Sequence, residues 1–253
     1  IRAPRRDFHH LTPQQLADAI NATENPRDRC LIATAITTGL RTSDLIDLRL
    51  SNINLDNATI TLRIQKTDVE TVKPIPIELD RELRRWLTHY EELKIHPQAA
   101  ATPKHQWHLF PRFYTNPTDG TYIADPAHGL TTRSARNIAH KTLQKIGIQW
   151  HGECLHLFRR SAARVFFDQL AASGHDTALL ATRAFLDHSS VAVTEKYIGL
   201  NTERQFVINS LARKPFLPQQ QTAPAAEAAG AEERNIHETN DNTMRRLRLT
   251  RRR

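Results

Sequence analysis

Cysteine, glycine, methionine and aromatic residues are all scarce in this chain of 253 residues, which has 2 cysteines, 8 glycines, 1 methionine and 6% aromatic residues. The two cysteines, Cys30 and Cys154, lie far apart, and Cys30 falls in an apolar helical stretch. We therefore expect Cys30 to be a buried free thiol. The spacing excludes a disulfide scaffold and favours a cytosolic protein.

Long apolar segments are missing as well. No run approaches the roughly 18 apolar residues of a membrane span. The first ten residues are charged and rich in histidine, and no apolar core follows them, so we expect neither a signal peptide nor a membrane partner. The chain opens on Ile1 instead of methionine, which leads us to expect a fragment or a processed product of a longer protein.

Motifs for common cofactors are absent. The sequence has no Walker loop, no glycine fingerprint of a dinucleotide-binding fold and no Gly-x-Ser-x-Gly elbow. His151, Cys154 and His156 lie close together, but no second cluster has the spacing of metal ligands. We therefore expect no metal and no cofactor.

Positive charge is in excess, with a formal net charge of +8. The last ten residues hold six arginines and the segment 218–243 carries a net −4, so +6 remains on residues 1–217. A basic folded part suits a polyanionic partner such as nucleic acid, although charge alone is a weak indication.

Residue patterns predict a mainly helical chain. Thr12 as N-cap, Pro13 at the first helical position and Gln15 as capping-box partner mark a helix start. Gly39 and Gly174 mark helix ends, and Thr42 or Ser43 is expected to cap a short helix. Beyond the helix that starts at Pro13, helices are predicted at 27–38, 42–47, 80–93, 131–146, 156–173, 176–186, 190–198 and 203–212.

One region changes to the alternating pattern of strands. Ile60, Leu62 and Ile64 alternate with polar residues, and alternation returns over 72–77, where two prolines indicate an edge strand. This predicts a hairpin with Lys66 at or near its turn. The stretch 94–128 is interpreted as a long loop with one short strand near Leu109. The fold class is therefore α+β, mainly α-helical, with a small antiparallel hairpin.

Composition divides the chain into three parts. Residues 1–11 are interpreted as an arm or the end of an interdomain linker, and residues 12–217 as one domain. Residues 218–253 are predicted to be a disordered tail with an Arg-rich end, because 218–243 has almost no large apolar residue. The arginines of the tail are equally consistent with a DNA contact and with a charged terminus that has no role.

Two segments contain arginine and histidine in positions that suit phosphodiester chemistry. Arg41 follows Gly39 closely, and His156 and Arg159 are three residues apart, so that they share one helix face. Cleavage without a metal requires fixed cations around the phosphorus, and the arginine fork can hold two phosphate oxygens. The ordinary alternative is that these are solvated surface residues.

A third segment, Leu186–Tyr197, adds His188 and, nine residues later, Tyr197. Ser189 or Ser190 is expected to cap the helix that carries the tyrosine. A tyrosine hydroxyl can serve as a nucleophile toward phosphorus. Taken alone, Tyr197 has the alternative of a half-buried core residue.

In this order, with a hairpin between the first two, the three segments resemble the catalytic domain of the tyrosine recombinases, or phage-type integrases. Leu186–Tyr197 resembles the pattern L-G-H-S-S-x-x-x-T-x-x-Y, and Thr38–Leu45 resembles T-G-x-R-x-x-E-L. Asp187 replaces the glycine of the first pattern and Asp44 the glutamate of the second. The resemblance spans about residues 30–212.

The resemblance implies a set of roles. Tyr197 attacks the phosphate, Arg41 and Arg159 hold its nonbridging oxygens, and His156 is the base or hydrogen-bond partner. His188 donates a further hydrogen bond, and Lys66 protonates the leaving 5′ oxygen, with Lys73 as the alternative acid. Asp44 is expected to orient Arg41 or to pair nearby, and Asp187 to alter the turn or the charge of the histidine. Arg160 and Arg164 are interpreted as backbone contacts or surface charges outside the centre.

The resemblance also implies a DNA partner and a function. We expect a site-specific recombinase that acts on double-stranded DNA sites, as a homotetramer in which 203–212 docks on a neighbour or packs in cis. Integration and excision of a phage or mobile element is favoured. The alternatives are a chromosome-dimer resolvase, a type IB topoisomerase-like enzyme, and a DNA-binding protein without catalysis.

Overall fold

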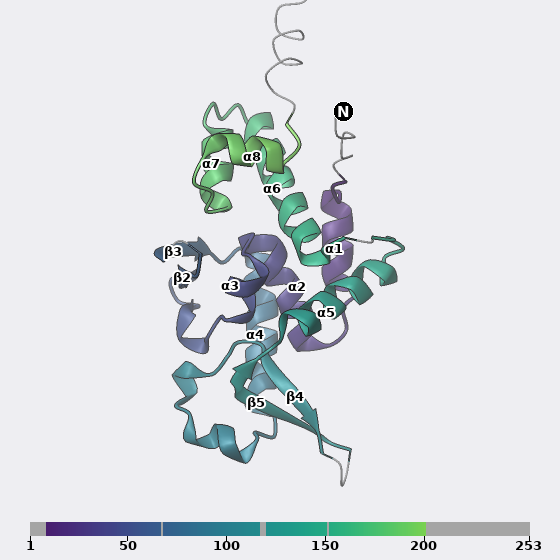
Figure 1. Cartoon of the computed structure of the whole chain (residues 1–253), viewed down its shortest axis with the longest axis vertical. Helices are drawn as coiled ribbons and strands as arrows, with labels where there is room; N and C mark the ends of the chain where they lie inside the picture. The colour runs from purple at the N-terminus through teal and green to yellow at the C-terminus, as the bar shows by residue number, and fades with distance from the viewer. Residues whose placement is uncertain (1–8, 67, 117–119, 151, 201–253) are drawn as a thin grey trace, which may run out of the picture. The chain divides into compact units, whose positions relative to one another are not determined.

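The computed structural model describes residues 9–66, 68–116, 120–150 and 152–200 (Figure 1). In this part of the chain the fold is α+β and mainly helical, as predicted. The helices are α1 (Pro13–Asn21), α2 (Pro26–Thr38), α3 (Thr42–Ile46), α4 (Ile77–Glu91), α5 (Thr132–Lys145), α6 (Cys154–Ala172), α7 (Ala178–Phe185) and α8 (Val191–Tyr197), and the strands are β1 (Ile53–Asn54), β2 (Thr59–Ile64), β3 (Val69–Pro74), β4 (Pro111–Thr115) and β5 (Tyr122–Gly129).

The first helices begin and end where local chemistry predicts. Thr12 and Gln15 form the expected capping box at the start of α1. Gly39 ends α2 in the left-handed conformation, with φ of 60°. The cap predicted for the helix after Gly39 is wrong. Helix α3 already begins at Thr42, so Thr42 and Ser43 lie inside it, and Arg41 takes the N-cap position without a side-chain cap hydrogen bond.

The predicted hairpin is present. β2 pairs antiparallel with β3, and β1 adds a short third strand on the other side of β2. Ile60, Leu62 and Ile64 are the buried residues of β2, whereas β3 is largely exposed, as expected of an edge strand. Lys66 lies in the connection and is exposed.

The stretch 94–128 is not the long loop that the sequence predicted. It contains two short 3₁₀ turns, Pro97–Ala101 and Lys104–Gln106, and a second antiparallel hairpin of β4 and β5. A register shift lies between Pro111 and Arg112, and the interrupted alternation hides these strands from a period-two search. The strand expected near Leu109 begins two residues later, at Pro111.

Helix α6 is the element on which the others converge. It contacts α1, α2, α5 and α7, and Figure 1 shows it extending from α1 toward α7 and α8. Phe158 on this helix is fully buried in the main core, where such a side chain stabilises the fold by about 1.5–3 kcal/mol. Cys30 is a buried free thiol in the same core, as predicted.

A smaller apolar cluster lies apart from the main core. It is built on Ala163 of α6, Leu186 after α7 and Ile198 after α8, with Tyr197 packed against it. It gives α7 and α8 a core of their own at one end of α6.

The remaining helices confirm their predicted positions with end shifts of one to three residues. α4 starts at Ile77, earlier than expected, because Pro76 is its N-cap and Glu78 and Asp80 occupy its first turn. The helix predicted at 203–212, the tail 218–253 and most of the arm 1–11 lie outside the described residues. No helix in the described ranges is both long and apolar enough to cross a membrane.

Gly39 is expected to be sensitive to substitution, because a Cβ there would lie 2.5 Å from a ring carbon of Phe185 and the backbone is left-handed. We predict that Gly39→Ala lowers the free energy of unfolding by about 2–4 kcal/mol, measured by urea denaturation. The matched control is Gly147→Ala, where φ is +75° but nothing lies within 4 Å, and only the backbone cost of about 1 kcal/mol applies. Equal losses in the two variants would contradict the close approach.

Candidate active site

One pocket gathers five of the six residues that the sequence singled out. Its cavity volume is about 320 Å³. Glu153, the N-cap residue of α6, also lines the pocket, as do the first two residues of α3. The lining residues are Leu40, Arg41, Thr42, Ser43, Glu153, Leu155, His156, Arg159, His188 and Tyr197.

Arg41 enters the pocket from the turn between α2 and α3. Its Nη1 is buried, and no group among the described residues accepts a hydrogen bond from it. Asp44, which was expected to orient Arg41 or to pair nearby, accepts a hydrogen bond from the Gln65 backbone N–H at 3.1 Å. Asp44 therefore ties α3 to the hairpin connection, and an unsatisfied guanidinium nitrogen is left available for an anion.

Arg159 holds the two sides of the pocket together. Its side chain is buried, with 4% exposure, and Nη1 donates to the Gly39 carbonyl while Nη2 donates to the Leu186 carbonyl at 2.6 Å. Burial lowers the pKa of Arg159, and an arginine nevertheless remains charged because its ordinary pKa lies so far above neutrality. A single guanidinium thus joins the α2–α3 turn, α6 and the turn after α7.

His156 and Tyr197 face each other across the pocket. The Tyr197 hydroxyl lies 3.5 Å from His156 Nδ1, and the two rings meet edge to face. Burial, with Arg160 and Arg159 nearby, lowers the pKa of His156, so the ring is neutral at pH 7 and can accept a proton. Burial raises the pKa of Tyr197, and the arginines oppose that rise. In the free protein Tyr197 is therefore a neutral phenol next to a neutral imidazole.

His188 approaches the other edge of the tyrosine ring, with centroids 5.1 Å apart. Burial and the charges of Arg159 and Arg41 lower the pKa of His188 to about 4. Its Nδ1 lies 3.1 Å from the Thr194 hydroxyl. That hydroxyl donates its proton to the Ser190 carbonyl at 3.3 Å, so it accepts from Nδ1. Nε2 of the neutral ring is then an acceptor, and it donates a hydrogen bond only when the ring is protonated.

The turn that presents His188 is fixed by local capping. Ser190 caps α8 by accepting from the Val193 N–H at 3.3 Å, as one of the two predicted serines. Asp187, the departure from the family pattern, has φ of 49°, the left-handed region that glycine adopts freely. Its carboxylate raises the pKa of His188, but burial and the two arginines outweigh it.

Lys66 is the candidate that the structure does not bring into the pocket. It is exposed in the hairpin connection and does not line the cavity. Lys73, the alternative acid, is buried on β3 and forms an ion pair with Asp187 at 2.7 Å.

Arg160 lies close to the Tyr197 ring, although it was interpreted from the sequence as a backbone contact or surface charge outside the site. Its guanidinium carbon lies 5.6 Å from the centroid of the Tyr197 ring, and its charge lowers the pKa of both Tyr197 and His156. The doubled arginine after Phe158 is the only sequence signal that could have indicated this. Arg164 instead forms an ion pair with Asp168.

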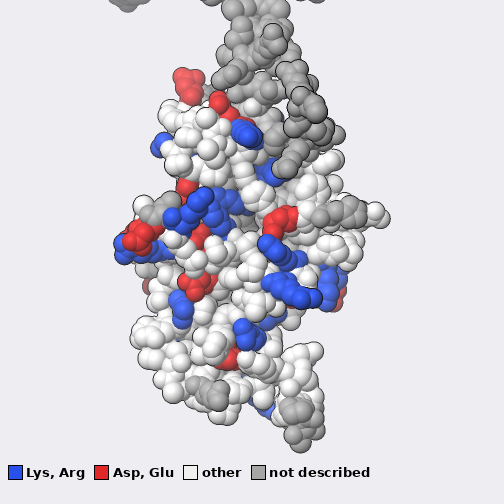
Figure 2. Space-filling view, in the orientation of Figure 1, with Lys and Arg blue, Asp and Glu red and all other residues white. Residues whose placement is uncertain are grey.

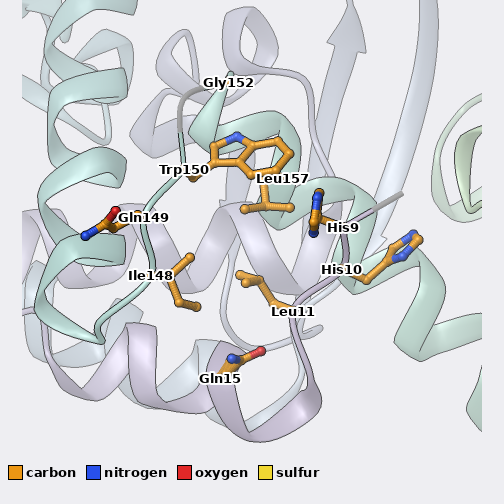
Figure 3. A pocket seen from close by; sticks show the side chains of 9 residues that line it. All are labelled: His9, His10, Leu11, Gln15, Ile148, Gln149, Trp150, Gly152 and Leu157. Carbon is orange, nitrogen blue, oxygen red and sulfur yellow. The ribbon is translucent and has the colours of Figure 1, made fainter. Parts of the chain in front are cut away.

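A second pocket does not have the lining expected of a phosphate-binding site. It lies between the start of α1 and the segment before α6, and His9 packs edge-on against Trp150 with ring centroids 5.6 Å apart (Figure 3). None of its described lining residues is lysine or arginine, so no fixed cation from the described part of the chain lines it. The lining residues are His9, His10, Leu11, Gln15, Ile148, Gln149, Trp150, Gly152 and Leu157.

The expected absence of a metal rests on the sequence pattern alone, since His151 of the alternative ligand set lies outside the described residues. Within the part of the chain that the structure describes, no group of three or more His, Cys, Asp and Glu side chains is arranged to hold a metal ion.

The chain is similar in sequence to a known protein family and to curated proteins. Residues 9–204 match the Phage integrase family. Among curated proteins, the type 1 fimbriae regulatory protein FimE of Escherichia coli strain K12 is 26% identical over 184 residues, which cover 70% of this chain and 77% of FimE.

Solved structures share the fold. The XerA recombinase aligns with a TM-score of 0.58 at 19% identity, covering 85% of this chain and 68% of XerA. The XerH site-specific recombinase, in a post-cleavage complex with its palindromic difH substrate, aligns with a TM-score of 0.57 at 18% identity, covering 81% of this chain and 53% of XerH.

The lowered pKa of His188 leads to a pH-dependent stability. Between its ordinary value of 6.5 and the folded value of about 4, the unfolded chain binds more protons than the folded one. The contribution of His188 is therefore complete above pH 6.5 and is lost as the pH falls toward 4. We expect an NMR titration to give a midpoint near 4, and His188→Gln to weaken the loss of unfolding free energy over this window. A midpoint at 6.5 or above would contradict the desolvated, arginine-flanked site.

Proposed function

The chain belongs to the phage integrase family, and from this premise we propose that it cleaves and rejoins specific DNA sites through a covalent 3′-phosphotyrosyl link to Tyr197. The observation that carries the proposal is that Arg41, His156, Arg159 and His188 line one pocket together with Tyr197, whose hydroxyl lies 3.5 Å from His156 Nδ1. These residues come from the α2–α3 turn, α6 and the turn before α8, so the grouping is a product of the fold and not of sequence proximity.

The proposed reaction is an in-line displacement at phosphorus. The Tyr197 oxygen forms a bond to phosphorus as the bond to the 5′ oxygen breaks, which leaves a 3′-phosphotyrosyl link and a free 5′ hydroxyl. The phenolic proton passes to His156 Nδ1, which is neutral and 3.5 Å away. The leaving oxygen receives a proton from Lys66. A 5′ hydroxyl of a partner strand reverses these steps and reseals the DNA.

Charge stabilisation comes from fixed donors. The free Nη1 of Arg41 offers a hydrogen bond to a nonbridging oxygen, and the remaining N–H groups of Arg159 supply others. His188 donates from Nε2 once the entering anion favours the protonated ring. These donors are already buried and oriented, so little reorganisation is needed when the phosphorane forms. The same cations favour the phenolate form of Tyr197 as its proton leaves.

Surface charge supports DNA as the substrate. In Figure 2, lysine and arginine side chains gather across the middle of this face, over the β2–β3 hairpin, α3 and α5. Arg133 and Lys141 are exposed on α5, and Arg63 and Lys66 are exposed on the hairpin. Basic groups on both sides of the pocket suit a duplex that crosses it, and the contacts to its phosphates make binding salt-dependent.

For the working assembly we propose a homotetramer on two DNA sites, in which the segment 203–212 docks on a neighbouring protomer. The apolar residues Phe206, Val207, Ile208 and Leu211 in this segment support a docking role. For the biological role we propose integration and excision of a mobile element. The substitutions Asp44 and Asp187 and the Arg-rich tail support a divergent element over a chromosome-dimer resolvase.

The nucleophile can be tested with a suicide substrate, a duplex nicked near the cut site. After cleavage the short fragment that carries the free 5′ hydroxyl diffuses away, so the covalent adduct cannot be resealed. We expect the native protein to form a covalent protein–DNA adduct, seen by denaturing gel, and Tyr197→Phe to form none because the attacking oxygen is gone. Tyr114→Phe, at an exposed tyrosine of β4, is the control and is expected to match the native protein. An equal amount of adduct from Tyr197→Phe would show that Tyr197 is not the nucleophile. A separate assay, strand exchange between two labelled DNA sites, distinguishes recombination from nicking and closing within one duplex.

The acid can be tested through the leaving group. Lys66→Ala is expected to slow single-turnover cleavage by about 10²–10⁴-fold, because the leaving alkoxide is no longer protonated. A substrate whose 5′ bridging oxygen is replaced by sulfur releases a thiolate, which needs no acid. Cleavage of that substrate should be nearly unaffected in Lys66→Ala. An equal defect on both substrates would show that Lys66 acts in binding and not as the acid.

A further inference from the structure

The turn that presents His188 is held from two directions. Arg159 donates to the Leu186 carbonyl at 2.6 Å from the α6 side. From the β-hairpin side, Lys73 Nζ donates to the Phe185 carbonyl at 2.8 Å and lies 2.7 Å from the Asp187 carboxylate. These bonds hold three consecutive residues just before His188, with Phe185 and Asp187 held by β3 and Leu186 by α6.

A second strand-borne group completes this attachment. The Thr71 hydroxyl donates to the other oxygen of Asp187 at 3.0 Å. Thr71 and Lys73 are two apart on β3, so both point to the same face of the sheet. Asp187 therefore contacts β3 through both carboxylate oxygens, one accepting a hydrogen bond from Thr71 and the other forming the ion pair with Lys73.

Asp187 occupies a position where its side chain has a conformational cost. His188 N–H bonds to the Arg183 carbonyl and Asp187 N–H to the Ala184 carbonyl, which is the pattern of a helix end that requires one left-handed residue. Glycine meets that requirement without strain, whereas Asp187 meets it at φ of 49°. The ion pair to Lys73 offsets this strain.

Lys73 is too enclosed to protonate DNA itself. Its side chain is 4% exposed, and two of its three N–H donors are committed to Phe185 and Asp187. Burial lowers its pKa, and the nearby carboxylate opposes that shift. Its place in the fold suggests another use, because β3 is joined through the hairpin connection to Lys66, the proposed acid.

We propose that Lys73 and Asp187 are positioning residues that latch the Lys66 hairpin to the His188 turn, so that the acid and the phosphate-binding groups approach the DNA as one unit. This inference rests on the proposed function, since it concerns how the acid is delivered to the same scissile phosphate. The Asp44 bond to the Gln65 N–H holds the start of the hairpin connection, and the latch holds the returning strand. The hairpin is thereby fixed at both ends, with Lys66 between them.

The test variant is the double substitution Lys73→Met/Asp187→Gly. It removes both charges together, so no buried ion is left unpaired, and glycine suits the left-handed turn. Urea denaturation checks that its stability stays close to that of the native protein. The control is Lys104→Met/Glu91→Gly, which removes an exposed ion pair of 3.1 Å between Glu91 at the end of α4 and Lys104 in the second 3₁₀ turn after it.

Single-turnover cleavage at saturating DNA is measured on the oxygen and the bridging-sulfur substrates. We expect the latch variant to be about 10–100-fold slower than the native protein on the oxygen substrate, because the acid is misplaced. On the sulfur substrate it should lie within about threefold of the native rate, since no acid is needed. The control variant should match the native protein on both.

Other outcomes would overturn the latch. Equal slowing on both substrates would mean that the pair supports the phosphate site alone, and native rates on both would mean that it has no role in delivery. If the double variant fails to fold, Asp187→Asn replaces it, because asparagine keeps the side-chain size and a carbonyl oxygen for Thr71. The same selective slowing on the oxygen substrate is then required. Absence of any Tyr197 adduct from the native protein would instead refute the proposed function, which is a separate result.

Discussion

A buried guanidinium is the constraint on which the site depends. Arg159 must satisfy its charge inside the protein, and it does so with the carbonyls of Gly39 and Leu186. Those carbonyls belong to the two turns that present Arg41 and His188. Since an unpaired buried charge is far more costly than an unpaired neutral group, the two turns are held in place by the requirement to solvate one arginine. Both turns use left-handed residues, Gly39 and Asp187, to aim their carbonyls at it.

Burial and the concentration of positive charge together determine the protonation states in the pocket. Burial, reinforced by the arginines, lowers the pKa of both histidines, and burial keeps Tyr197 protonated. With both imidazoles neutral, Arg41 and Arg159 repel each other across the pocket, and Glu153 is the one carboxylate among its described lining residues. Binding a phosphate therefore relieves repulsion as well as forming hydrogen bonds, which favours the diester over neutral groups of similar shape.

The features that the sequence predicted correctly are those that depend on residues close together in the chain. The capping box at Thr12, the glycine stop at Gly39 and the alternation in β2 each correspond to one element. The motif order predicted the side chains that line the pocket except for Lys66, which lies outside it. The β4–β5 hairpin was missed because its register shift interrupts the alternation. The position of Arg160 over the Tyr197 ring and the pairing of Lys73 with Asp187 depend on contacts between residues far apart in sequence, which no local pattern encodes.

The smaller apolar cluster at the end of α6 has a consequence for the energetics of the nucleophile. Tyr197 packs with Ala163, Leu186 and Ile198, and these residues are separate from the main core that contains Phe158. Withdrawing α8 from the pocket would therefore sacrifice the burial of only a few side chains and leave the larger core intact. The position of Tyr197 is thus set by a small cluster, and a displacement of α8 would expose fewer apolar side chains than a displacement of an element in the main core.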